Sequence, residues 1–96
     1  MIDPATASEA LDQVRAIVTG SRRKSHGEAE RSFGTISTFW TAYLGHPVSP
    51  ADVCRMMALL KVARAVHGAD PDHDIDMIGY GALAVEMEAA NRDSDK

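Results

Sequence analysis

Apolar residues recur at intervals of three and four along most of this 96-residue chain, and no segment alternates as a half-buried strand would. Gly and Pro residues separate the periodic stretches. The pattern predicts an all-α protein, a small bundle of about four helices, with residues 1–90 as one helical domain and residues 91–96 as a polar tail. We expect helices from Asp3 or Thr6 to Gly20, from Glu28 to Leu44, from Pro50 to His67, and from after Asp74 to about Ala90.

Local capping signals set these boundaries. Thr6 and Glu9 have the spacing of a capping box, which places a helix start at Thr6. Ser49 precedes Pro50, so a capping side chain stands directly before a proline in the first helical position. Gly45 suits the left-handed conformation in which many helices end.

The bulky part of the core is small. The chain has 15 alanines but only 19 residues of Leu, Ile, Val and Phe combined. A domain of this size buries roughly 60–65% of the surface of its unfolded chain. We therefore expect a second chain to complete the core, as a homodimer, and the alternative is a four-helix monomer.

Two segments carry most of the bulky apolar residues. The first, residues 28–44, is expected to supply most of the core through a stripe of Phe33, Ile36, Trp40, Tyr43 and Leu44. The second, residues 50–67, is expected to be central because its apolar face is broad. That face consists of Val53, Met56, Leu59, Leu60, Ala63 and Val66.

The segment from residue 75 to residue 89 carries two stripes. One contains Asp76, Tyr80, Leu83 and Met87. The other starts at Ile75 and repeats at steps of three and four. Two stripes need two covering surfaces, one from the domain core and one from an oligomer or another partner. We expect the partner interface to consist of Ile78, Ala82, Val85 and Ala89.

Charge and cysteine content exclude several classes of protein. The formal net charge is −4, because residues 1–67 carry 8 basic and 6 acidic side chains and residues 68–96 carry 2 and 8. This basic content is weak for a nucleic-acid binder, so no nucleic-acid partner is expected. No apolar run is long enough to span a membrane, the N-terminus does not resemble a signal peptide, and a single cysteine fits a reducing compartment. We expect a cytoplasmic protein.

The acidic segment 70–76 is unusual in composition. An EF-hand is excluded, because glycine and glutamate are absent from the sixth and twelfth positions that its loop requires. A magnesium site is one interpretation, and the other is that Asp74 caps the last helix while its neighbours face solvent. Asp76 shares a stripe with Tyr80, so we expect it to be partly buried and paired with Lys61 or Arg64.

Four ordered strings carry a resemblance to a known family. They are Arg23-x-x-His26-Gly27-Glu28, Phe39-Trp40-x-x-Tyr43-Leu44-Gly45, Asp52-Val53-x-x-Met56-Met57-x-x-x-Lys61-x-x-Arg64 and Asp74-x-Asp76-x-x-Gly79-Tyr80. Over about residues 22–86 the chain resembles a family of small phage and prophage proteins classed as a domain of unknown function. The resemblance implies an all-helical fold and a phage-associated gene.

A more distant likeness is to the all-α nucleoside triphosphate pyrophosphatases of the MazG and dimeric dUTPase type. Those enzymes use helix-borne carboxylates to hold Mg²⁺ ions that bridge phosphates and activate a water. The likeness implies a metal site at Glu28, Asp74 and Asp76. It also implies phosphate contacts from Arg23, Lys61 and Arg64.

Two functions follow from these observations. The first is a small phage-type accessory protein that binds a macromolecular partner, such as a host enzyme or a defence system, including action as a CRISPR inhibitor. The partner would be a host or phage protein, and the accessory protein would be a homodimer. The alternative is a Mg-dependent nucleoside triphosphate pyrophosphatase-like or nucleotide-binding protein. The sequence lacks a complete catalytic constellation, so we assign no catalytic residue and no cofactor other than Mg²⁺ for the alternative.

Overall fold

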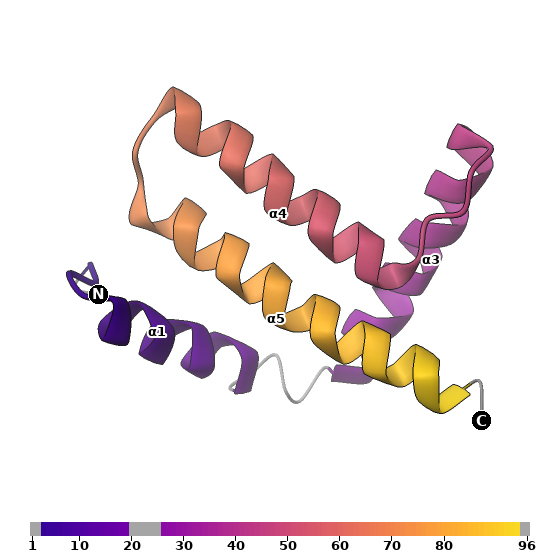
Figure 1. Cartoon of the computed structure of the whole chain (residues 1–96), viewed down its shortest axis with the longest axis horizontal. Coiled ribbons are helices and arrows are strands. Elements are labelled where there is room, and N and C mark those ends of the chain that lie inside the picture. The colour runs from indigo at the N-terminus through magenta and orange to yellow at the C-terminus, as the bar shows by residue number, and fades with distance from the viewer. Residues whose placement is uncertain (1–2, 20–25, 95–96) are drawn as a thin grey trace.

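The computed structural model describes residues 3–19 and 26–94, and these residues fold into helices joined by short connections (Figure 1). The helices are α1 (Ala7–Thr19), α3 (His26–Leu44), α4 (Pro50–His67) and α5 (Pro71–Ser94). The described ranges contain no strand. The predicted all-α fold of about four helices is confirmed.

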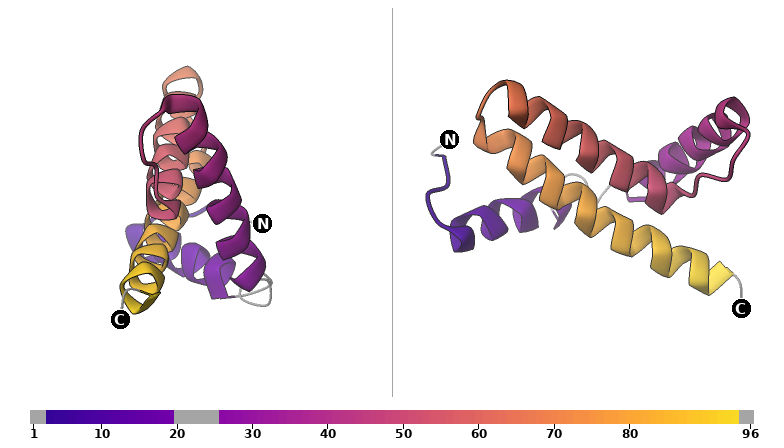
Figure 2. Two further views of the ribbon diagram at one scale, coloured as in Figure 1. Left: turned by 90° about the vertical axis from the view of Figure 1, so that its right-hand side faces the viewer. Right: turned by 45° about the horizontal axis from the view of Figure 1, so that its top comes forward.

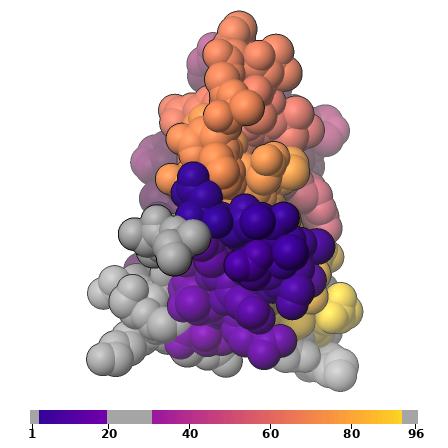
Figure 3. All heavy atoms as spheres, turned by 90° about the vertical axis from the view of Figure 1, so that its left-hand side faces the viewer, coloured from indigo at the N-terminus to yellow at the C-terminus, as the bar shows by residue number. Residues whose placement is uncertain are grey.

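An antiparallel pair of helices, α4 and α5, forms the centre of the molecule (Figures 1 and 2). α1 packs on the N-terminal half of α5, and Figure 3 shows it lying across that side, below the connection between α4 and α5. α3 crosses α4 near its first turns. The core lies where these helices meet and contains Ala51, Cys54, Leu83, Ala84 and Met87, with Phe33 and Tyr80 packed against it.

The predicted caps are present. The Glu9 backbone N–H donates to Thr6 Oγ1 at 3.1 Å at the start of α1. The Asp52 N–H donates to Ser49 Oγ at 3.0 Å, which is half of a complete capping box at the start of α4. Gly45 ends α3 with φ of +67°, a conformation that strongly favours glycine. These ends form as predicted because each depends on residues within one turn of the chain.

The start of α5 differs from the prediction. The helix begins at Pro71, not after Asp74, so the acidic segment is helical. Asp70 is the capping residue, since its Oδ1 accepts a hydrogen bond from the Asp72 N–H at 3.0 Å. The expectation that Asp74 caps the helix is wrong, because the Asp-Pro pair before it already provides a cap and a first helical residue. At its other end α5 continues to Ser94.

The prediction that residues 28–44 supply most of the core is wrong. Phe33 is half-buried against the core cluster, but Tyr43 is 90% exposed and Leu44 is 55% exposed. The reason is the position of α3, which contacts α4 near the start of that helix and then diverges from it (Figures 1 and 2). The C-terminal half of the aromatic stripe therefore has no helix to pack against within the described chain.

α4 is central, as predicted, but most of its broad apolar face is exposed. Val53 is fully buried, whereas Leu59 is 66% exposed and Val66 is 78% exposed. The face that meets α5 instead carries Ala51 and Cys54, both almost completely buried. Small side chains at a helix contact let two helices approach closely, and this packing turns the bulkier residues of α4 outward.

Candidate interaction surface

The candidate functional surface is the exposed stripe of α5, which we call the α5 stripe and define as Ile78, Ala82, Val85 and Ala89. Val85 is 68% exposed and Ile78 is 36% exposed. Ala82 is exposed and Ala89 is half-buried. Leu83 and Met87, which pack in the core, lie on the other side of the same helix.

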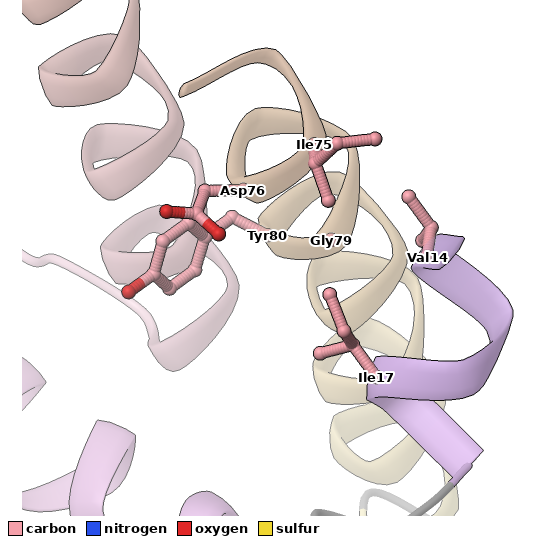
Figure 4. A pocket seen from close by; sticks show the side chains of 6 residues that line it. All are labelled: Val14, Ile17, Ile75, Asp76, Gly79 and Tyr80. Carbon is pink, nitrogen blue, oxygen red and sulfur yellow. The ribbon is translucent and has the colours of Figure 1, made fainter. Parts of the chain in front are cut away.

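The two predicted stripes of α5 therefore have different environments. Leu83 and Met87, from one stripe, are buried at 6% and 4% exposure. From the other stripe, Ile75 is 4% exposed, and it lines a depression with Val14 and Ile17 of α1 (Figure 4). Beyond Ile75 the second stripe becomes the exposed α5 stripe. The described chain thus buries the second half of one stripe, at Leu83 and Met87, and only the beginning of the other, at Ile75.

The depression between α1 and α5 is too small to be a ligand site. It is lined by Val14, Ile17, Ile75, Asp76, Gly79 and Tyr80, and it has room for only about one water molecule. In Figure 4 the side chains of Asp76 and Tyr80 point away from α1, toward the neighbouring helix. We interpret this depression as a packing feature of the contact between α1 and α5.

Asp76 pairs with Lys61, which is one of the two partners that the sequence predicts. Lys61 Nζ lies 2.9 Å from Asp76 Oδ2, and the lysine side chain is only 15% exposed whereas the aspartate is 37% exposed. The pair joins the middle of α4 to the second turn of α5. It therefore links the two central helices beside their apolar contact.

We expect Asp76→Leu to lower the free energy of unfolding by about 1–2 kcal/mol, because the poorly exposed Lys61 would lose its carboxylate partner. Lys61→Met should have a similar effect. The double variant should lose less stability than the sum of the two single losses. Urea denaturation of all four proteins, followed by circular dichroism, measures this coupling. Strict additivity would mean that the pair adds nothing to stability.

A second set of ionic contacts joins α4 to α5 nearer the core cluster. Arg55 Nη1 lies 3.1 Å from Asp52 Oδ1 and 3.5 Å from Glu88 Oε1. The hydrogen bond from the Ser49 backbone N–H to Asp52 is the main cause of a lowered pKa of this carboxyl group. These side chains are about half exposed, so the contacts orient the helices but add little stability. Only the contact between Arg55 and Glu88 joins the two helices, and sequence analysis missed it because these residues are distant in the chain.

The predicted metal and phosphate residues are only partly brought together. Lys61 and Asp76 meet, while Arg64 and Asp74 are exposed. Arg23 and the side chain of Glu28 lie outside the described part of the structure. Among the described residues, no three His, Cys, Asp or Glu side chains are placed to hold one metal ion. Magnesium and nucleotide binding therefore stay predictions from the sequence.

The environment of the α5 stripe is acidic. Asp72 and Asp74 are exposed in the first turn of α5, and Glu88 is 41% exposed toward its other end. Residues 68–96, which include the whole helix, carry 8 acidic and 2 basic side chains. The candidate surface is thus an apolar stripe on an acidic helix.

Within the described residues, no helix is both long and apolar enough to cross a membrane.

Comparison with known proteins places the chain in a family. Gene 55 protein of Mycobacterium phage L5 is 35% identical over 80 residues, which cover 81% of this chain and 51% of that protein. Gene 55 protein of Mycobacterium phage D29 is 32% identical over 71 residues, or 73% of this chain and 47% of that protein.

The chain thus spans about half the length of these curated relatives. No solved structure matches it. A family model described as "Domain of unknown function (DUF6378)" matches residues 9–88. Because that match covers most of its length, the chain belongs to the DUF6378 family.

Proposed function

We propose that this protein acts by binding another protein through the α5 stripe. The observation that carries the proposal is the exposure of Val85, at 68%, within a row of apolar residues on a helix whose opposite side packs into the core through Leu83 and Met87. Single exposed apolar residues are common on monomers, but a continuous apolar row on one helix face is typical of interaction surfaces.

The spacing of the α5 stripe favours one mode of recognition. Its residues are separated by four, three and four positions, which puts them on one side of the helix over three turns. Amphipathic helices with anchors at this spacing bind in hydrophobic grooves of partner proteins. The partner that fits is therefore a protein with an apolar groove of about this length.

The charge of α5 adds a second requirement for the partner. Residues 68–96 have a net charge of −6, so basic side chains beside the groove would accelerate association and favour this orientation. A host enzyme or a nucleic-acid-handling defence system, such as a CRISPR effector, has basic surfaces of this kind. This role agrees with the similarity of the chain to mycobacteriophage proteins.

The test uses two matched substitutions in the full chain. Val85→Glu places an acid in the middle of the α5 stripe, and Leu11→Glu places one at a similarly exposed apolar position of α1, where Leu11 is 58% exposed. Tagged wild-type protein and both variants are used to capture proteins from a mycobacterial lysate. Each captured protein is then purified, and its affinity for the three baits is measured by calorimetry.

We expect a purified partner to bind the wild-type and Leu11→Glu proteins equally and to bind Val85→Glu at least about thirtyfold more weakly, as for an interface hot spot. Circular dichroism should show the same helix content in all three proteins. A partner that binds all three equally would assign recognition to a different surface. Capture of no specific protein by the wild type would contradict the proposed function.

A further inference from the structure

An uncovered apolar surface of the described chain lies on α4, and sequence analysis did not identify it as exposed. We call it the α4 apolar face and define it as Met56, Leu59, Leu60, Ala63 and Val66. Leu59 is 66% exposed, Leu60 40% and Val66 78%. Residues with these spacings share one side of a helix, and the core contacts of α4 come from Ala51 and Cys54 on other sides. All five residues of the α4 apolar face are exposed.

The size of the exposed surface indicates that something covers it. The chain has an accessible surface of 6747 Å², whereas a folded monomer of 10.3 kDa exposes about 5,400 Å². Its radius of gyration is 14.4 Å, against about 12.5 Å for a domain of this length. The excess of roughly 1,300 Å² exceeds the ~800 Å² that each partner buries in an interface of standard size. An excess of this size matches the area that one subunit buries when it joins a second chain.

We propose that a second copy of this chain covers the α4 apolar face, so that the two α4 helices pack antiparallel across a two-fold axis. Leu59 and Leu60 lie at the middle of α4 (Pro50–His67), where a two-fold axis would bring each leucine against the same pair in the second copy. If the two helices packed parallel instead, helix ends of like charge would lie side by side.

The ends of α4 carry opposite charges. Asp52 is in the first turn, whereas Arg64 and His67 are in the last turn. Antiparallel packing brings the acidic first turn of each copy beside the basic last turn of the other, and it also aligns the helix dipoles favourably. The antiparallel alignment of the helix dipoles thus favours this orientation of a second copy. The charged side chains add less, because Asp52 is already paired with Arg55 of its own chain at 3.1 Å.

The position of α3 leaves room for this contact. α3 crosses α4 near its first turns and then diverges, so the middle and the C-terminal end of α4 are not covered by it (Figures 1 and 2). The α4 apolar face points away from α5, and the α5 stripe points away from α4. Dimerisation through α4 therefore leaves the α5 stripe free. The proposed dimer and the proposed binding of a partner through the α5 stripe can thus fail separately.

The first test measures the mass of the full chain in solution. Sedimentation equilibrium of the wild type at tens of micromolar should give twice the chain mass of 10.3 kDa. Leu59→Glu should give the mass of one chain, because a dimer would bury two acids at its centre. Leu11→Glu and Val85→Glu, which alter exposed residues of other helices, should both remain dimers. Circular dichroism of Leu59→Glu should keep its helical signal, since that side chain is 66% exposed in the single chain.

The second test reports the geometry. Leu60→Cys places a thiol beside the proposed two-fold axis, and mild oxidation should give a covalent dimer, while Val85→Cys should give none. The native Cys54 is fully buried and does not interfere. A wild-type monomer at all concentrations would overturn the proposal. A dimer that the Leu59→Glu substitution leaves intact would also overturn the proposal. A dimer that is lost only in the Val85→Glu variant would assign self-association to the α5 stripe instead.

Discussion

Replacing Leu83 with alanine is expected to lower the free energy of unfolding by about 3 kcal/mol. Leu83 is 6% exposed and belongs to the cluster that joins α4 to α5, so truncation removes apolar contacts and leaves a cavity. A domain of this length has a total stability of about 5–15 kcal/mol, so the loss is a large fraction of it. Urea denaturation followed by circular dichroism at one fixed protein concentration measures the change.

Val85→Ala is the matched control for this prediction. Val85 lies two residues further along the same helix but is 68% exposed, so its truncation should change the stability by less than about 0.5 kcal/mol. Alanine has a higher helix propensity than either residue, and its advantage is larger over valine than over leucine, so propensity adds to the expected difference between the two variants. Equal stability losses in the two variants would contradict the assignment of Leu83 to the core and of Val85 to the surface.

Cys54 should react with thiol reagents at least about a hundredfold more slowly in the folded protein than in the unfolded chain. Burial raises the pKa of this thiol to about 11, from an ordinary value of 9.0, so the reactive thiolate is about a hundredfold scarcer at pH 8. The side chain is also fully buried, which prevents access of the reagent. The rate of reaction with iodoacetamide at pH 8, in buffer and in urea, measures the difference.

The Leu83→Ala variant provides an internal check on this second prediction. If labelling of Cys54 requires the core to open, the destabilised variant should react faster than the wild type in buffer, with no change in the rate in urea. Both residues belong to the same cluster, so the opening is the same event. A thiol that reacts in the native protein within tenfold of its unfolded rate would mean that the contact between α4 and α5 is open in solution.

Parts of the candidate site could be predicted from the sequence. Asp76 is expected to be partly buried and paired with Lys61 or Arg64, and its pairing with Lys61 at 2.9 Å is confirmed. The exposure of Val85 agrees with the expectation that the second stripe of α5 needs another surface. These predictions succeeded because helical periodicity relates residues within one element, and a partly buried carboxylate needs a nearby cation.

The start of α5 shows the limit of reasoning from composition. Alternating acids in residues 70–76 indicated a loop, yet Asp70 and Pro71 together start the helix before most of them. The signal was present in the sequence, because a capping residue followed by proline is a strong helix start. The acidic composition also agrees with this start, because carboxylates in the first turn stabilise a helix.

The sequence by itself determined the helical fold, most helix ends and the two-sided character of α5, because periodicity, Ser49 and Gly45 act within a few residues. Only the tertiary structure decided which apolar faces are buried. α4 packs on α5 through Ala51 and Cys54 and leaves Leu59 in solvent, although all three are apolar. Periodicity in the sequence identifies which residues share an apolar helix face, but it does not identify the helix that packs against that face. The close approach of two helices depends on side-chain size at their contact, which is settled only when both helices are in place.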